Sequence, residues 1–98
     1  MDVRFKDLVI DRLECEAGFD GGFPAAVVKS FRKRMQQIRA AQDERAFYQL
    51  KSLCFEKLKG VRTEHHSMRL NDQWRLIIQF EGAGPNKIVL IVGIEDYH

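Results

Sequence analysis

The sequence predicts a small α+β protein, with N-terminal helices packed on one face of a twisted antiparallel β-sheet. Three observations support this fold class. Apolar residues recur at helical spacing as far as Leu50, they alternate with polar residues from Glu64 onward, and clusters of turn residues separate these segments. With 98 residues, of which 45% are hydrophobic, the chain is expected to form one domain over residues 1–98.

The chain is predicted to begin with a short strand and a helix. Residues 3–5 are expected to be extended. Residues 6–16 are expected to be helical, because Leu8, Val9 and Leu13 lie at helical spacing. Glycines then interrupt the pattern, so we expect a loop before the next element.

The longest predicted helix covers residues 25–41. Pro24 suits its first turn, where the missing N–H of proline would have no partner in any case. Apolar side chains recur along the helix at steps that keep them on one face: Val27, Val28, Phe31, Met35 and Ile38. A short third helix, capped by Asp43, is predicted to follow with the apolar residues Ala46, Phe47 and Leu50.

The second half of the chain predicts a three-stranded antiparallel meander. Residues 64–70 and 73–80 alternate between apolar and polar side chains, and the Asn71–Asp72 pair favours a tight turn between them. Residues 87–94 are apolar on both faces, as is typical of a central strand that helices cover on one side. Gly93 is predicted to mark a bulge that aims the residues after it.

A basic stripe lies opposite the apolar face of the helix at residues 25–41. It consists of Lys29, Arg32, Lys33, Gln36 and Arg39. Because the formal net charge is only +2, binding to nucleic acid would depend on such local concentrations of charge. Lys29, Arg32 and Lys33 are therefore candidates for contact with phosphate or acidic protein, although a solvated helix face explains the stripe equally well.

Proton-transfer groups gather directly after the last predicted strand. These are Asp96, Tyr97 and His98, with Glu95 before them. Asp96 and His98 are two residues apart in an extended segment, so their side chains are expected to point the same way. A carboxylate beside an imidazole can exchange protons near neutral pH, although a histidine at this place is by itself more often without a chemical role.

Candidate phosphate-binding groups precede that cluster. Gln73 and Arg75 are two residues apart and are expected to share one face of a strand, where an amide and a guanidinium can hold one phosphate. Lys59 is a candidate third donor and Glu56 a second acid. Cleavage of RNA by its own 2′-hydroxyl needs a base, cations around the phosphate and an acid for the leaving oxygen. Taken singly, such residues are more often ordinary surface groups.

The remaining candidates for chemistry are interpreted as structural. Cys15 and Cys54 are far apart and without paired metal or redox spacing, so both are predicted to be reduced packing residues. His65 and His66 would face opposite sides of a strand, which argues against a shared metal. No secretory leader or membrane-spanning run is apparent, and we expect a cytoplasmic protein without a cofactor or a membrane partner.

These segments together resemble the HigB/RelE family of bacterial toxins from toxin–antitoxin pairs. The resemblance covers nearly the whole chain, chiefly through Leu58-Lys59-Gly60, Ser67-Met68-Arg69-Leu70-Asn71-Asp72-Gln73-Trp74-Arg75 and Asp96-Tyr97-His98. It implies a RelE-like fold and an endoribonuclease that cleaves messenger RNA on the ribosome without a metal. The implied catalytic residues are Lys59, Arg75, Asp96, Tyr97 and His98, with Glu56 added here, and Gln73 and Arg69 are implied to contact RNA.

The resemblance also implies partners, and two departures from the family pattern leave alternatives open. A HigA-like antitoxin is expected, with operator DNA reached through that complex. Family members often have His where Glu56 stands and some have Asn where Gln73 stands. A carboxylate is a weaker base than an imidazole, so slower cleavage is one hypothesis. The alternatives are a ParE-like toxin that binds gyrase without catalysis, and a weakened toxin that survives as an antitoxin- or operator-binding module.

Overall fold

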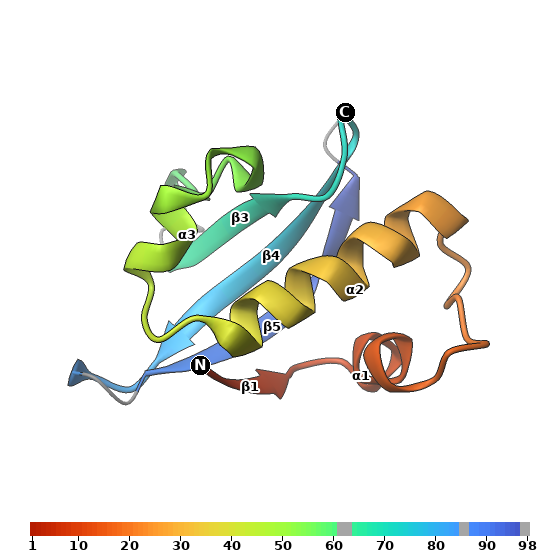
Figure 1. Ribbon diagram of the computed structural model, residues 1–98, viewed down its shortest axis with the longest axis horizontal. Coiled ribbons are helices and arrows are strands. Elements are labelled where there is room, and N and C mark those ends of the chain that lie inside the picture. The colour runs from red at the N-terminus through yellow and green to blue at the C-terminus, as the bar shows by residue number, and fades with distance from the viewer. Residues whose placement is uncertain (61–63, 85–86, 97–98) are drawn as a thin grey trace.

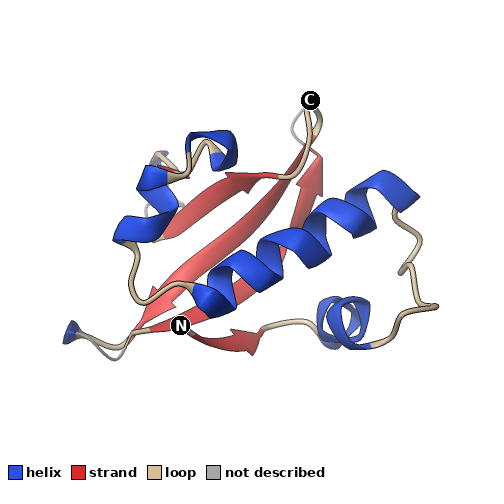
Figure 2. Ribbon diagram, in the orientation of Figure 1, coloured by secondary structure: helices blue, strands red, loops and turns tan. Residues whose placement is uncertain are grey.

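A computed structural model describes residues 1–60, 64–84 and 87–96. It contains one mixed five-stranded sheet in the order β1-β5-β4-β3-β2, in which β1 runs parallel to β5 and the other neighbours are antiparallel (Figures 1 and 2). The predicted meander is confirmed as β3-β4-β5, whereas the sequence did not predict the parallel pairing of β1. The strands are β1 Asp2–Phe5, β2 Glu56–Lys57, β3 His65–Arg69, β4 Trp74–Glu81 and β5 Ile88–Asp96.

α-Helices and a short 3₁₀ helix accompany the sheet in the described part of the chain. In Figure 1 the longest of them, α2, crosses in front of β4 and β5, and α1 lies beside it. Among the described residues, no helix has the length and apolar character needed to cross a membrane. The helices are α1 Leu8–Cys15, α2 Ala25–Ala40, α3 Arg45–Gln49 and the 3₁₀ helix η1 Lys51–Leu53.

The apolar face of α1 agrees with the predicted one at Leu13 but not at Leu8 and Val9. Asp7 caps the helix, because its Oδ1 accepts from the backbone N–H of Val9 at 2.8 Å. Ile10 and Leu13 are buried, whereas Leu8 is 78% exposed and Val9 41% exposed. Helical spacing alone fits either set of residues, and the packing of α1 against α2 and β1 decides which one faces inward.

The core lies between α2 and one face of the sheet. All five apolar residues predicted on α2 are buried, each contributing about 1.5–3 kcal/mol relative to full exposure. They meet side chains of β3, β4 and β5 that share one face by strand alternation. These partners are Met68, Leu76, Ile78, Val89 and Ile91.

A bulge interrupts the pairing of β4 with β5 next to Gly93, where the sequence predicted one. Ile77 is opposite Gly93 and Ile78 is opposite Ile91, so Val92 is the extra residue on β5. The residues after the bulge resume regular pairing, with Arg75 opposite Glu95 and Trp74 opposite Asp96. The bulge thus determines which side chains at the end of β5 lie opposite those of β4.

Both cysteines are exposed, so their predicted packing role is wrong. Cys15 ends α1 on its solvent side, where its Sγ donates to Oδ1 of Asp11 at 3.4 Å and the pKa of the thiol is raised. Cys54 follows η1 in the left-handed conformation, with φ of 46°. Its Sγ donates to the carbonyl of Lys51 at 3.7 Å, so neither thiol belongs to the core.

An aromatic cluster closes the end of the core beneath α3, and His66 belongs to it. The imidazole stacks on Phe55 with ring centroids 5.0 Å apart and meets the edge of Phe80 at 5.2 Å. His65 pairs with Gln79 and His66 with Ile78, so the two histidines face opposite sides of the sheet as predicted. Burial lowers the pKa of His66, because the cluster disfavours the charged imidazolium.

The lowered pKa of His66 predicts a loss of stability in acid. Below its ordinary value of 6.5 the unfolded chain binds a proton that the folded chain resists, so the free energy of unfolding falls as the pH falls. Urea denaturation between about pH 7.5 and about pH 5 should show a steeper loss for the natural chain than for His66→Phe. Parallel losses would show that His66 does not resist protonation.

Candidate functional site

The candidate site begins with a row of charged residues across three strands. Arg69 of β3 is opposite Arg75 of β4, and Arg75 is opposite Glu95 of β5. Their neighbours Met68 and Leu76 face the core. Arg69 and Arg75, which we call the arginine row, therefore project from the opposite face of the sheet. Two like charges directly opposite each other are unfavourable unless anions balance them. Glu95 supplies one such charge, and the carboxylate of Asp72 forms an ion pair with Arg69.

The turn between β3 and β4 is held by Asn71. Its Oδ1 accepts from the backbone N–H of Gln73 at 2.9 Å and from that of Trp74 at 2.8 Å. Its backbone carbonyl accepts from Nη1 of Arg75 at 2.9 Å. A single residue therefore fixes the turn and one orientation of the Arg75 guanidinium, which confirms the tight turn expected at this place.

Gln73 and Asp96 meet at the same end of the sheet. β4 begins at Trp74, so Gln73 belongs to the turn and not to the strand that was expected to align it with Arg75. Its Nε2 donates to Oδ2 of Asp96 at 3.0 Å. Asp96 is the last described residue of β5 and is exposed. Tyr97 and His98, the other predicted members of the terminal cluster, lie outside the described residues.

The structure places Glu56 closer to the arginine row than Lys59. Glu56 of β2 is opposite Ser67, which is two residues before Arg69 on the same face of β3. Lys59 follows β2 in the other direction, toward His65, whose carbonyl accepts from the backbone N–H of Leu58 at 2.9 Å. Both predicted side chains are exposed. Glu56 lies beside Ser67 of β3, whereas Lys59 lies beyond the pairing of β2 with β3, past His65.

The basic stripe of α2 is divided by its contacts. The guanidinium of Arg32 donates to carbonyl oxygens of four residues: Leu13, Glu16, Ala17 and Phe19, at 3.0–3.3 Å. Arg39 forms an ion pair with Glu14 at 2.7 Å. Lys29 and Lys33 are exposed on α2, which covers the core face of the sheet, so they and the arginine row lie on opposite sides of it.

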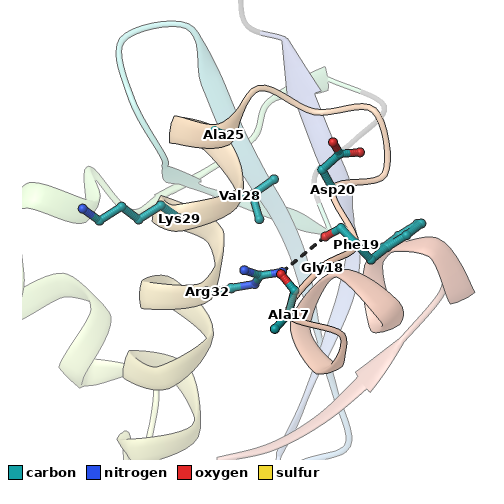
Figure 3. A pocket seen from close by; sticks show the side chains of 8 residues that line it. All are labelled: Ala17, Gly18, Phe19, Asp20, Ala25, Val28, Lys29 and Arg32. Atoms are coloured by element: carbon teal, nitrogen blue, oxygen red, sulfur yellow. Dashed lines mark hydrogen bonds between the residues drawn. The ribbon is translucent and has the colours of Figure 1, made fainter.

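Figure 3 shows the pocket that Arg32 borders. Its volume is about 340 Å³, and Phe19, Asp20, Val28 and Lys29 are among its walls. Arg32 extends from α2 toward the loop after α1, where a dashed line marks its contact with Phe19. The guanidinium thus holds the glycine-containing loop against α2, a structural role that the sequence pattern did not separate from phosphate binding.

Arg34 is the residue near the site that sequence reasoning missed. It is 8% exposed, its Nε donates to the carbonyl of Arg69 at 2.9 Å, and burial followed by the charge of Arg69 lowers its pKa. It links α2 to the end of β3 from beneath the arginine row. A signal was present in the sequence, because position 34 lies on the apolar stripe between Phe31 and Ile38.

No group of three or more potential ligands among histidine, cysteine and acidic residues could hold a metal ion within the described part of the chain. His65 and His66 do not form such a group because their side chains lie on opposite faces of β3. What the described residues do bring together is a set of guanidinium groups, one anchored amide and a carboxylate at the end of the β3–β4 hairpin. These groups can bind an anion and handle a proton close to it.

Comparisons with known proteins were made on sequence and on structure. Residues 4–98 match the model of a family described as the RelE-like toxin of the type II toxin–antitoxin system HigB. A search of curated proteins finds no match. Among solved structures, a YoeB/ParE toxin from Agrobacterium tumefaciens is similar, with a TM-score of 0.61 and 16% sequence identity over 100% of both chains. At this identity the structural similarity shows a shared fold.

The contacts of Arg32 predict a stability effect that a phosphate-binding role would not produce. Arg32→Lys should lower the free energy of unfolding by about 1–2 kcal/mol, because a lysine ammonium cannot reach the same set of carbonyls. Urea denaturation measures this loss. The exposed neighbour provides the control, since Lys33→Ala should change the free energy by less than about 0.5 kcal/mol. Equal stabilities for both variants would contradict the structural role.

The contacts of Asn71 predict a local effect on the hairpin. In Asn71→Ala the backbone N–H groups of Gln73 and Trp74 lose their acceptor, so their amide protons should exchange roughly tenfold faster, as measured by nuclear magnetic resonance. Asn71→Asp keeps an acceptor oxygen and should retain most of the protection. Unchanged exchange at both amides in the alanine variant would show that the turn does not depend on this side chain.

Proposed function

Because the chain belongs to the RelE-like HigB toxin family of type II toxin–antitoxin systems, we propose that it is an endoribonuclease that cleaves messenger RNA on the ribosome. Membership of this family implies an antitoxin partner. Beyond family membership, we propose the reaction, the residues that carry it out and its target. The observation that carries them is the arginine row, which lies at the same end of the sheet as Asp96.

The arginine row supports the proposal through its charge. Arg69 and Arg75 project from the same face of neighbouring strands, and each can offer a planar fork of donors to phosphate. Their local counter-charges are the carboxylates of Glu95 and Asp72. RNA phosphates would bind the same guanidinium groups, beside these carboxylates or in their place. A phosphate bound here would lie at the end of the sheet where β5 ends with Asp96, a group that can transfer a proton.

The proposed reaction is a transesterification within the RNA. A base removes the proton of a 2′-hydroxyl, the 2′-oxygen attacks the adjacent phosphorus, and the bond from phosphorus to the 5′-oxygen breaks. An acid protonates that leaving oxygen, which gives a 2′,3′-cyclic phosphate and a 5′-hydroxyl end. We assign the base and acid jointly to Asp96, Tyr97 and His98, because these groups are neighbours in the sequence and interacting groups titrate as a unit. No metal or cofactor enters this scheme.

The cationic residues are proposed to stabilise the crowded phosphate. Arg75 is the principal one, since Asn71 already fixes one side of its guanidinium. Arg69 and Lys59, which follow Arg75 in the direction of β3 and β2, would contact the RNA backbone. Glu56 is a further candidate acid or base, because it shares the face of the arginine row through its pairing with Ser67. Lys29 and Lys33 would contact a different part of the target, such as ribosomal RNA.

The proposed setting follows from the proposed reaction. Ribosome-bound messenger RNA is the substrate, and a HigA-like antitoxin is the neutralising partner, through which operator DNA can also be reached. The cytoplasm, where ribosomes translate, is the proposed compartment. The solved neighbour is named a YoeB/ParE toxin, so a gyrase-binding toxin of the ParE kind and a partner-binding module without toxicity are the results that the experiment must separate from cleavage.

Expression without the antitoxin tests the proposal. The natural chain should arrest growth and create new 5′ ends in translated messenger RNA, and Arg75→Ala or His98→Ala should reduce these ends about 10²–10³-fold. Arg45→Ala removes an exposed side chain of α3 and is the control that should leave them unchanged. Growth arrest without new ends would point to gyrase or another bound target. No arrest would point to a partner-binding module.

A further inference from the structure

We propose that Gln73 is a positioning residue: its side-chain amide holds the Asp96 carboxylate in one orientation and does not itself bind RNA. The inference rests on the proposed function and refines it, because the sequence placed Gln73 among the phosphate-binding residues. In this proposal Gln73 affects the reaction through Asp96 of β5.

The contact itself is specific. Nε2 of Gln73 donates to Oδ2 of Asp96 at 3.0 Å, across 23 residues of sequence. Among the described residues, Gln73 is the hydrogen-bond donor to this carboxylate. An exposed aspartate at the end of a strand otherwise samples several rotamers, each placing its oxygens differently. With Oδ2 engaged by the amide, Oδ1 is the oxygen left to accept from a hydroxyl of the substrate.

Both ends of the contact are anchored. The backbone of Gln73 is fixed because its N–H donates to Oδ1 of Asn71 at 2.9 Å. The backbone of Asp96 is fixed because it lies opposite Trp74 in the β4–β5 pairing. Gln73 precedes Trp74 directly, so the sheet sets the separation that the side chain must span. The length of glutamine meets that separation, and the shorter side chain of asparagine would leave a gap.

The same geometry argues against phosphate binding by Gln73. The N–H that faces Asp96 is already used in a hydrogen bond to a charged acceptor, which is stronger than one between neutral groups. A phosphate close enough to replace Asp96 at this amide would also approach the negative carboxylate.

A double-mutant cycle tests the inference. Single-turnover cleavage of messenger RNA on purified ribosomes would be measured for the natural chain, Gln73→Ala, Asp96→Ala and the double variant. Gln73→Ala should lower the saturating rate roughly tenfold or more, because a displaced catalytic group reacts slowly. The toxin concentration at half-saturation should change less than about twofold. In the Asp96→Ala background, Gln73→Ala should have no further effect.

Two further variants control for length and for folding. Gln73→Asn keeps an amide but cannot span the separation, so its rate should match that of Gln73→Ala. Gln49→Ala, an equivalent loss of an exposed glutamine on α3, should cleave as the natural chain does. Thermal unfolding of each variant identifies any loss of rate that comes from unfolding. If Gln73→Ala loses its fold, the rate of Gln73→Asn decides whether Gln73 positions Asp96.

The possible failures are distinguishable. If the natural chain does not cleave, the proposed function fails and this inference falls with it. If it cleaves but the losses from Gln73→Ala and Asp96→Ala multiply, Gln73 contacts RNA independently and only the positioning role is overturned. A raised half-saturating concentration with an unchanged saturating rate, full activity of Gln73→Asn, or full activity of Asp96→Ala would overturn it equally.

Discussion

The antiparallel register between β4 and β5 is the constraint on which the candidate site depends. It places Arg75 opposite Glu95 and Trp74 opposite Asp96, and the contact between Gln73 and Asp96 follows from that placement. A slip of one residue would move every side chain of β5 to the other face of the sheet. The core prevents such a slip, because Ile78 and Ile91 are opposite each other in its buried centre, and the bulge at Val92 adjusts the pairing beyond them.

Arginine serves several physical purposes in this small protein. Arg32 gathers carbonyl groups of the loop after α1, and Arg34 is buried beneath the end of β3. These two support the fold, whereas Arg69 and Arg75 project from the face opposite the core. A count of positive charges would treat all four alike. The planar fork of donors suits each purpose, and burial and available acceptors determine which one applies.

Much of the fold was predictable from local patterns. The buried face of α2, the turn at Asn71, the meander and the bulge near Gly93 were all expected and all occur. Each depends on residues close together in sequence. The parallel pairing of β1 with β5 and the inward face of α1 were not predicted, because both depend on contacts between distant segments. The cysteines were wrongly expected to pack inside, since residue type alone does not show whether a position faces the core.

The sequence alone determined the family pattern, the order of elements and the types of side chain available for chemistry. The tertiary structure decided which of them meet. Gln73 contacts Asp96 on the neighbouring strand, Arg32 contacts a loop where the pattern allowed phosphate, and Glu56 shares the face of the arginine row. The physical reason is that helical and strand periodicity fix the direction of a side chain relative to its own element. Its partners depend on the register and packing of other elements, which only the folded chain specifies.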